Sequence, residues 1–262
     1  MGSEDVVGII PAAGKGRRLA PYPLPKELFP IGHQLVEVEG QLQQRPMVVS
    51  QYLIEAMVAA QLNRLYIVLG PGKLDIVEYY RNGEAYGVPF AYVFQSEARG
   101  MPYALDLVSP WLKGNETILM GMPDTIIEPR DAFNRLLNAH RTWKADLTLG
   151  LFPTERPQKF GMIGINAAHD VIAHQDKPRQ TDLKWLWGIT CWGPAFTTFM
   201  HETLEQEGRE IAARRGREPV LGDIFDLALA RGLRVKGLPF EDGRYIDIGT
   251  YDDLRQAVLL YA

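Results

Sequence analysis

The sequence contains a single cysteine, Cys191, among its 262 residues. One cysteine excludes an intramolecular disulfide and any cysteine-rich metal site. Its neighbours are apolar, so we expect a thiol buried in a strand. The five histidines are scattered along the chain and match no metal-ligand spacing. The sequence has neither a serine nucleophile elbow nor a cysteine–histidine pair, so no motif indicates a covalent intermediate.

Long apolar runs and an excess of positive charge are also missing. No stretch approaches the length of a membrane span and no signal peptide is visible, which favours a cytoplasmic protein that binds no membrane. A formal net charge of −4 at pH 7 gives no electrostatic basis for binding nucleic acid. What the chain does have is 46% hydrophobic residues, enough for the core of one large domain.

The stretch from Val6 to Gly32 organises the first half of the chain. It begins with the apolar run Val6–Ile10, which predicts a buried parallel strand. The loop that follows contains Ala13, Gly14 and Gly16, whose small side chains let the backbone N–H groups approach an anion. Small residues and cations after a first strand predict a polyphosphate site. Four cations accompany the loop: Lys15, Arg17, Arg18 and Lys26.

The glycine spacing matches neither of the two common phosphate loops. A dinucleotide fingerprint needs a third glycine where Leu19 stands, and a P-loop needs a lysine directly after its second glycine. The whole string Ala12–Leu19, followed by Pro25-Lys26, instead resembles the signature of the sugar-1-phosphate nucleotidylyltransferases, the glucose-1-phosphate thymidylyl/uridylyltransferase family. This resemblance implies that the loop wraps a nucleotide, that Arg18 holds the departing pyrophosphate and that Lys26 contacts the α-phosphate. For Lys15 and Arg17, contact with phosphate and simple solvation both remain open.

Apolar periodicity predicts alternating strands and helices up to about residue 143. Such alternation indicates a doubly wound sheet with right-handed crossovers, in which ligands bind beyond the carboxyl ends of the strands. The first loop, Gln95 and Asp124 all follow predicted strands. The expected elements are a polar hairpin or excursion at 33–45, helices at 46–60, 74–80, 100–112 and 131–143, and strands at 65–69, 90–95 and 117–120.

Strands prevail after residue 147. The sequence predicts a single domain over 1–262, in which about 6–145 bind the nucleotide and about 146–262 bind the sugar and close the fold. The segment 205–219 is dense in Glu and Arg, which is typical of a solvated helix end or loop. The expected strands are 147–152, 160–165, 171–174, 187–192, 234–238 and 245–248, and the expected helices are 194–204, 221–230 and 251–261.

Further motifs extend the resemblance along the chain. Gln95 and Gly100 match the family residues that read a pyrimidine base. An amide can pair with both a donor and an acceptor on a base edge, and a glycine lets the ring lie against the backbone. Gly161, Asp176 and Lys177 match the motifs that hold the sugar, with Asp176 in place of the usual Glu. The resemblance implies that Lys177 takes the phosphate of the sugar; an ordinary polar turn before a proline is the alternative.

Two tryptophans near these motifs, Trp185 and Trp187, fit either the wall of a sugar pocket or the core. We assign both to the core.

The resemblance also implies a magnesium site at Asp124 and Asp247. Asp124 ends a predicted strand, and Asp247 lies in Tyr245–Thr250, which resembles the family's aromatic-x-Asp-x-Gly-Thr motif. Mg²⁺ prefers oxygen ligands and usually takes one or two carboxylates together with substrate phosphates. Without the metal, two close carboxylates repel each other and the pKa of one of them rises.

Together, the motifs imply a mixed, mainly parallel Rossmann-like α/β sheet of the nucleotide-diphospho-sugar transferase type. The implied reaction is Mg-dependent, in-line nucleotidylyl transfer from an NTP, with dTTP or UTP favoured, to a sugar-1-phosphate. It needs shielding between two anions, which Arg18, Lys26 and Lys177 supply with the metal. The alternatives are a cytidylyltransferase acting on a phosphorylated alcohol and a non-catalytic nucleotide-binding relative. A glycosyltransferase would carry an Asp-x-Asp motif, which does not occur. The sugar, the base and whether the chain forms a homo-oligomer stay open.

Overall fold

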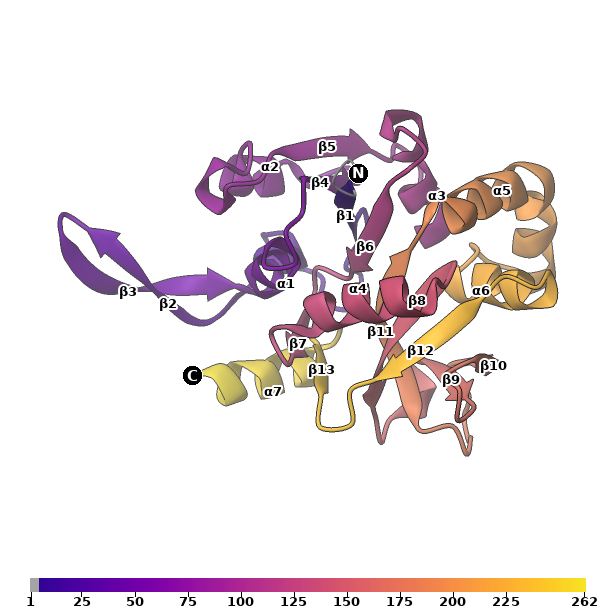
Figure 1. Cartoon of the computed structure of the whole chain (residues 1–262). Helices are drawn as coiled ribbons and strands as arrows, with labels where there is room; N and C mark the ends of the chain where they lie inside the picture. Colours follow the sequence, from indigo (N-terminus) through magenta and orange to yellow (C-terminus); the bar gives the residue numbers. More distant parts are fainter. Residues whose placement is uncertain (1–4) are drawn as a thin grey trace.

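The computed structural model describes residues 5–262 and contains a large mixed β-sheet with helices on both faces (Figure 1). The main path of this nine-stranded sheet runs β10-β9-β11-β6-β1-β4-β5, while β8 joins β11 and β12 joins β8. The architecture confirms the predicted Rossmann-like α/β class. The strands of this sheet are β1 (Val6–Ala12), β4 (Arg64–Leu69), β5 (Phe90–Phe94), β6 (Thr117–Gly121), β8 (Leu147–Pro153), β9 (Gly161–Ile165), β10 (Val171–Asp176), β11 (Trp185–Trp192) and β12 (Val235–Pro239).

Strand β1 lies inside the sheet, parallel to β4 on one side and to β6 on the other. Val7 and Ile9 pack into one hydrophobic core and Ile10 into the other, because successive side chains of a strand point to opposite faces. A strand buried on both faces must be apolar throughout, which explains the continuous run Val6–Ile10. The carboxyl ends of β1, β4 and β6 consequently lie at one rim of the sheet.

Helices cover both faces of the sheet. Residues of α1, α2 and α4 pack into the core that contains Ile10, and residues of α3, α5 and α6 into the core that contains Val7. Among the described residues, no helix has both the length and the apolar character that crossing a membrane requires. The helices are α1 (Val49–Val58), α2 (Leu74–Tyr80), α3 (Met101–Asp106), α4 (Ala132–Trp143), α5 (Pro194–Arg215), α6 (Leu221–Ala230) and α7 (Tyr251–Tyr261).

Three predicted helices have clearly different bounds in the structure. The helix expected over 46–60 is strand up to Val48 and helical only from Val49. The helix expected over 100–112 ends at Asp106 and is followed by a short 3₁₀ turn. Helix α5 does not end near residue 204 but continues to Arg215, because its Ala, Glu, Gln and Arg residues are good helix formers. Gly216, with a φ of 64°, then ends it in the left-handed conformation that glycine adopts easily.

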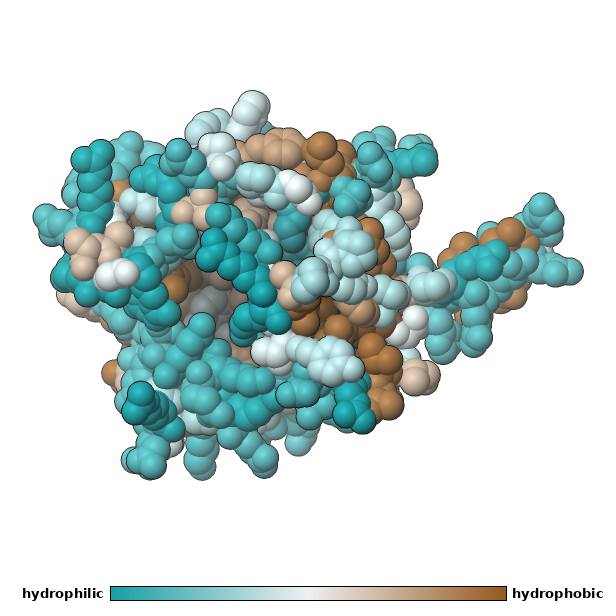
Figure 2. All heavy atoms as spheres, turned by 180° about the vertical axis from the view of Figure 1, so that it is seen from behind, coloured by the Kyte–Doolittle hydropathy of each residue, from teal (hydrophilic) through white to brown (hydrophobic). Residues whose placement is uncertain are grey.

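The polar excursion at 33–45 is a hairpin that projects from the body of the protein as an arm (Figures 1 and 2). It consists of the antiparallel strands β2 (Pro30–Val38) and β3 (Gln41–Val48). The turn residues Glu39 and Gly40 both have positive φ, which a two-residue hairpin turn twisted in the favoured sense requires. The arm leads back directly into α1.

A second ribbon brings the two halves of the chain together. Strands β7 (Thr125–Glu128) and β13 (Arg244–Asp247) pair antiparallel, with Asp247 opposite Thr125. The pairing places Asp247 next to Asp124, which ends the turn after β6. The sequence did not predict β7, because its four residues follow directly on the preceding strand and turn.

Candidate active site

A cavity of about 600 Å³ lies beyond the carboxyl ends of β1 and β6. Every residue that we predicted to bind nucleotide, sugar phosphate or metal lines this cavity, and so do Lys15 and Arg17. Segments far apart in the sequence thus meet at one place, as a doubly wound sheet requires. The predicted residues that line it are Ala13, Gly14, Gly16, Arg18, Lys26, Gln95, Gly100, Asp124, Gly161, Asp176, Lys177 and Asp247.

The loop after β1 presents its backbone to this cavity. A Cβ atom added to Gly14 would meet no atom within 4 Å, so packing within the protein does not explain the glycine. Gly16 has a φ of 59°, in the left-handed region, and its carbonyl accepts a hydrogen bond from the Leu19 N–H across 3.0 Å. The open space beside Gly14 and the exposed loop backbone suit a bound anion.

Lys26 lies in a 3₁₀ turn (Lys26–Leu28) and forms a short ion pair from Nζ to Oδ2 of Asp124. Both side chains are largely buried. Burial alone lowers the pKa of the Lys26 ammonium, but the neighbouring carboxylates, with the hydrogen-bonded Asp124 foremost, together raise it. The carboxylates of Glu27 and Asp247 add to the rise. Lys26 therefore keeps its positive charge at neutral pH.

For Asp247 the net shift of the pKa favours the uncharged form, in contrast to Lys26. Burial and the neighbouring Asp124 carboxylate raise the pKa of Asp247, in the direction expected for a carboxylate pair without a metal. Three groups oppose the rise: the Gly249 N–H, which donates across 2.7 Å, and the charges of Lys26 and Arg18. A Cβ on Gly249 would lie 2.7 Å from Nη2 of Arg18, so this glycine is what allows arginine and carboxylate to converge.

The carboxylate pair has the donor chemistry of a magnesium site. Asp124 and Asp247 are hard oxygen donors, and a divalent cation would neutralise their mutual repulsion. Within residues 5–262, no group of three or more His, Cys, Asp or Glu residues could hold a metal ion by itself. A metal at this pair would therefore take its remaining ligands from substrate oxygens and water, as Mg²⁺ commonly does.

Gln95 and Gly100, which we predicted to read a base, line the cavity together. The Gln95 side chain is almost buried, and its amide nitrogen donates to the Gly100 carbonyl across 3.4 Å. Gly100 has a φ of 101°, and a Cβ there would lie 2.4 Å from the carbonyl oxygen of Pro219. The glycine is thus required by the close approach of the 216–220 loop, a reason that the sequence did not reveal.

The predicted sugar side of the cavity is built around Asp176. Arg215 and Arg217 both form ion pairs with its Oδ2, the latter across 2.9 Å, and Arg215 also pairs with Asp223. Asp176 is therefore no ordinary polar turn residue. Lys177 follows it with a φ of 51°, and its N–H donates to the Phe160 carbonyl across 3.0 Å.

Two sequence predictions need correction here. We read the charged segment 205–219 as a solvated helix end or loop, which holds for most of it, but Arg215 lies against Asp176 and is mostly buried. We placed Trp187 in the core, but it is only half-buried and lines the cavity as well as packing against core residues. The sequence analysis also missed His174 and Gly222, which line the same wall. A stretch of charged residues does not reveal, from its own sequence, which partners elsewhere in the chain it will contact.

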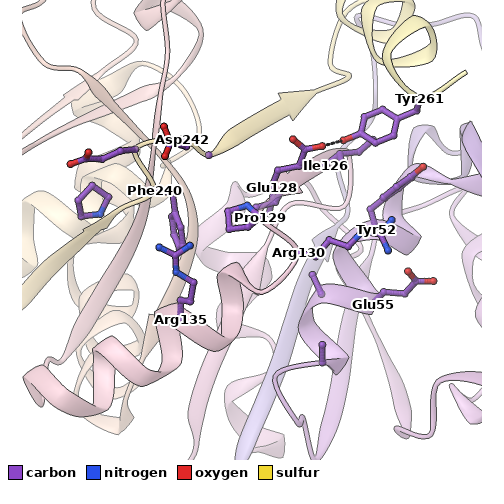
Figure 3. A pocket seen from close by; sticks show the side chains of 16 residues that line it. Tyr52, Glu55, Ile126, Glu128, Pro129, Arg130, Arg135, Phe240, Asp242 and Tyr261 are labelled. Carbon is purple, nitrogen blue, oxygen red and sulfur yellow. Dashed lines mark hydrogen bonds between the residues drawn. The ribbon is translucent and has the colours of Figure 1, made fainter.

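A second cavity, of about 940 Å³, opens between α7, α1 and the start of α4 (Figure 3). Figure 3 shows Glu128 accepting a hydrogen bond from the Tyr261 hydroxyl, across 2.8 Å, on one side of it. Arg135 lies over the Phe240 ring at 4.9 Å on the other side. None of the residues predicted to bind substrate or metal lines this larger cavity. The acidic pair and the small-residue loop therefore both lie at the smaller cavity.

The fold and the cleft together define an α/β protein in which the small-residue loop, its cations and the acidic pair meet at one rim of the sheet. A family model described as nucleotidyl transferase matches residues 7–262, so the chain belongs to that family.

The relatives to which the chain is similar include three named nucleotidyltransferases. The "Low-salt glycan biosynthesis nucleotidyltransferase Agl11" of Haloferax volcanii is 24% identical over 193 residues, which cover 72% of this chain; the chain spans about half (49%) of the length of that relative. "Glucose-1-phosphate thymidylyltransferase" of Neisseria meningitidis is 23% identical over 95% of this chain and 80% of its own length. "UTP--glucose-1-phosphate uridylyltransferase AglF" of H. volcanii is 25% identical over 95% and 93% of the two chains.

Two solved structures share the fold. A putative glucose-1-phosphate thymidylyltransferase from Bacillus anthracis has a TM-score of 0.81 at 22% identity, over 98% of this chain and 95% of its own. The inositol-1-phosphate CTP transferase from T. maritima has a TM-score of 0.70 at 16% identity, over 97% and 94%. At these identities the likeness extends to the fold only.

Proposed function

We propose that this protein transfers a nucleotidyl group from an NTP to a sugar-1-phosphate, with release of pyrophosphate. One observation carries the proposal: the cations Arg18 and Lys26 share a single cleft with the pair Asp124 and Asp247. Family membership and the names of the relatives support the same chemistry. The uridylyl and thymidylyl relatives favour UTP or dTTP as the nucleotide.

The reaction joins two anions that repel each other. An oxygen of the sugar phosphate attacks the α-phosphorus of the NTP, and the bond from that phosphorus to the bridging oxygen breaks. Pyrophosphate leaves with the electron pair. The second pKa of a phosphate monoester is about 6, so the attacking group is largely dianionic at neutral pH and needs no general base. What the protein must supply is alignment and neutralisation of charge.

The residues of the cleft divide these tasks. In this proposal the loop at Gly14 and Gly16 wraps the phosphates of the NTP, while Arg18 stabilises the departing pyrophosphate. Lys26, which burial does not discharge, neutralises the α-phosphate. Lys177 binds the phosphate of the sugar on the other side.

The two halves of the chain divide the substrates. Gln95 and Gly100, in the half formed by residues 6–145, place the base, while Asp176, in the half formed by 146–262, binds sugar hydroxyls. A magnesium ion held by Asp124 and Asp247 would supply further charge neutralisation at the reacting phosphates.

The proposal is tested by measuring pyrophosphate release from UTP, dTTP, CTP and GTP against a panel of sugar-1-phosphates. We expect release with UTP or dTTP that depends on the sugar-1-phosphate. Release only with CTP and a phosphorylated alcohol would instead favour the second candidate, a cytidylyltransferase. The inositol-1-phosphate CTP transferase from T. maritima has the same fold as this chain. Tight NTP binding without turnover would indicate a non-catalytic relative.

A further inference from the structure

The wall of the cleft beside Asp176 contains a hydrogen-bonded pair, His174 and Asp226. Nδ1 of His174 lies 3.0 Å and 3.1 Å from the two carboxylate oxygens of Asp226. A carboxylate only accepts hydrogen bonds, so Nδ1 must donate. In the neutral ring the other nitrogen, Nε2, is then an acceptor. The pair therefore holds the histidine ring in one tautomer.

The position of the ring is tightly determined. A Cβ on Gly222 would lie 2.3 Å from Cε1 and 2.6 Å from Nε2 of His174. A Cβ on Gly161 would lie 3.3 Å from the same Nε2. The ring thus occupies space that side chains at these two glycines would need. Phe225 packs edge-on against it, with ring centroids 6.3 Å apart, and only 2% of the histidine side chain is exposed.

Trp187 brings a donor to the same place. Its indole Nε1 would lie 2.4 Å from a Cβ on Gly161, and its ring packs edge-on against Phe225 at 5.2 Å. An indole N–H only donates. Over residues 5–262, Nε2 of His174 and Nε1 of Trp187 have no hydrogen-bond partner, yet neither atom is sealed from solvent. Both residues line the cleft.

A polar atom that reaches a cleft and has no partner in the protein is free to pair with a ligand, and a ligand that covers the atom without pairing with it costs the atom its hydrogen bond to water. We propose that His174 and Trp187 together bind one hydroxyl group of the substrate above Gly161 and thereby select the sugar. The hydroxyl donates to Nε2 of His174 and accepts from Nε1–H of Trp187. Asp226 acts as a positioning residue, because it accepts from Nδ1–H and so leaves Nε2 as the acceptor of the neutral ring. The inference rests on the proposed function and narrows the substrate to a phosphorylated sugar with a free hydroxyl at this point.

The chemistry explains why selection would be strong. An analogue that lacks the hydroxyl, or bears a methoxy group there, leaves one or both protein groups unpaired once the bound sugar has displaced water from them. Sites built to bind a hydroxyl reject analogues that lack it by a factor of about 10⁴ or more in favourable cases. For a site with two neutral partners that still opens into a cleft we expect a loss of about 10²-fold in kcat/KM.

The test is a matrix of proteins and substrates. The active sugar-1-phosphate from the pyrophosphate screen is compared with its monodeoxy analogues, using wild type, His174→Leu, Trp187→Phe and Asp226→Asn. In the wild type we expect one deoxy position to lose about 10²-fold in kcat/KM. In His174→Leu and Trp187→Phe the same position should lose less than about 10-fold relative to the parent sugar, because the protein partner is already gone. Asp226→Asn should reduce the same discrimination with the KM of the NTP unchanged.

The outcomes separate the two proposals. No turnover with any substrate pair contradicts the proposed function, and the inference with it. Turnover in the wild type with equal rates for every deoxy analogue overturns the inference alone. Equal losses for all analogues in the variants also overturn it, since that result indicates general damage to the pocket. Trp187→Phe keeps an aromatic ring against Phe225, so it provides an informative variant if His174→Leu does not fold.

Discussion

Nζ of Lys73 donates to Oε2 of Glu27 across 2.6 Å, and both side chains are nearly inaccessible, at 8% and 2% exposure. Glu27 follows Lys26 in the chain, and its backbone carbonyl accepts a hydrogen bond from the Ser50 hydroxyl, also across 2.6 Å. The turn that carries Lys26 is thus held from the start of α2 and from α1. The buried pair of Lys73 and Glu27, which we did not predict to contact substrate, thereby orients Lys26, the cation that we place in the mechanism.

Breaking this pair should reduce both stability and activity. Lys73→Met leaves the Glu27 carboxylate buried without its partner, and loss of one member of a buried ion pair costs about 3–5 kcal/mol. Burial already raises the pKa of Glu27, with Lys73 opposing the rise, so the variant should take up a proton at that site. Urea denaturation measures the loss. The double variant Lys73→Met/Glu27→Met should recover most of it; a single variant within 1 kcal/mol of wild type would contradict the assignment.

Lys26→Ala should lower turnover far more than it lowers stability. Removing one preorganised positive group at a developing charge costs about 10²–10³ in kcat. Lys113→Ala is the matched control, since Lys113 is 71% exposed and pairs with Asp5 across 3.3 Å. Steady-state kinetics and thermal denaturation of both variants provide the comparison. Turnover near the wild-type value in Lys26→Ala would remove this residue from the mechanism.

Asp247→Asn should stabilise the metal-free protein at pH 7 while lowering its activity. The pKa of Asp247 is raised in the folded state by burial and by Asp124, so the folded protein holds this proton more tightly than the unfolded chain. Its ionisation therefore lowers stability as the pH rises through that raised pKa. The asparagine removes the repulsion. Thermal denaturation in EDTA should show a higher Tm for the variant at pH 7 and a smaller difference near pH 3. A lower Tm at pH 7 would contradict the proposed repulsion.

Arg215→Met should weaken binding of the sugar phosphate and leave the NTP unaffected. The arginine holds both Asp176 and Asp223, and its loss frees the aspartate that faces the proposed sugar site. We expect about a 10-fold rise in the KM of the sugar-1-phosphate, the effect of roughly one charged hydrogen bond. Arg214→Met, at the exposed neighbouring position, is the control. Equal changes in both KM values would indicate a general loss of structure instead.

Local patterns predicted much of the fold and the position of the cleft. The apolar run of β1 and the small-residue loop after it are contiguous, and strand order alone carries Gln95 and Asp124 to the same rim. The arginine partners of Asp176 could not be predicted in this way. Arg215 lies 39 positions further along the chain, in a charged stretch whose composition is that of a solvated surface. Only the tertiary fold shows which charged side chains form ion pairs with each other.

Trp187 and His174 illustrate the same limit. Each occupies an ordinary strand position, and an aromatic side chain in a strand is most often part of the core. Their approach to Gly161 depends on β9, β10 and β11 lying side by side in the sheet. The sequence identified the glycine, but it did not show which side chains take up the space above it.

The central claim is that the cleft lets the sugar phosphate and the α-phosphate meet directly, without a covalent enzyme intermediate. The most direct test is the configuration at the α-phosphorus after turnover with an NTP that carries a stereochemically pure α-phosphorothioate. A single in-line displacement predicts a nucleoside diphosphate sugar with inverted configuration. Retention of configuration would require two displacements and would contradict the account.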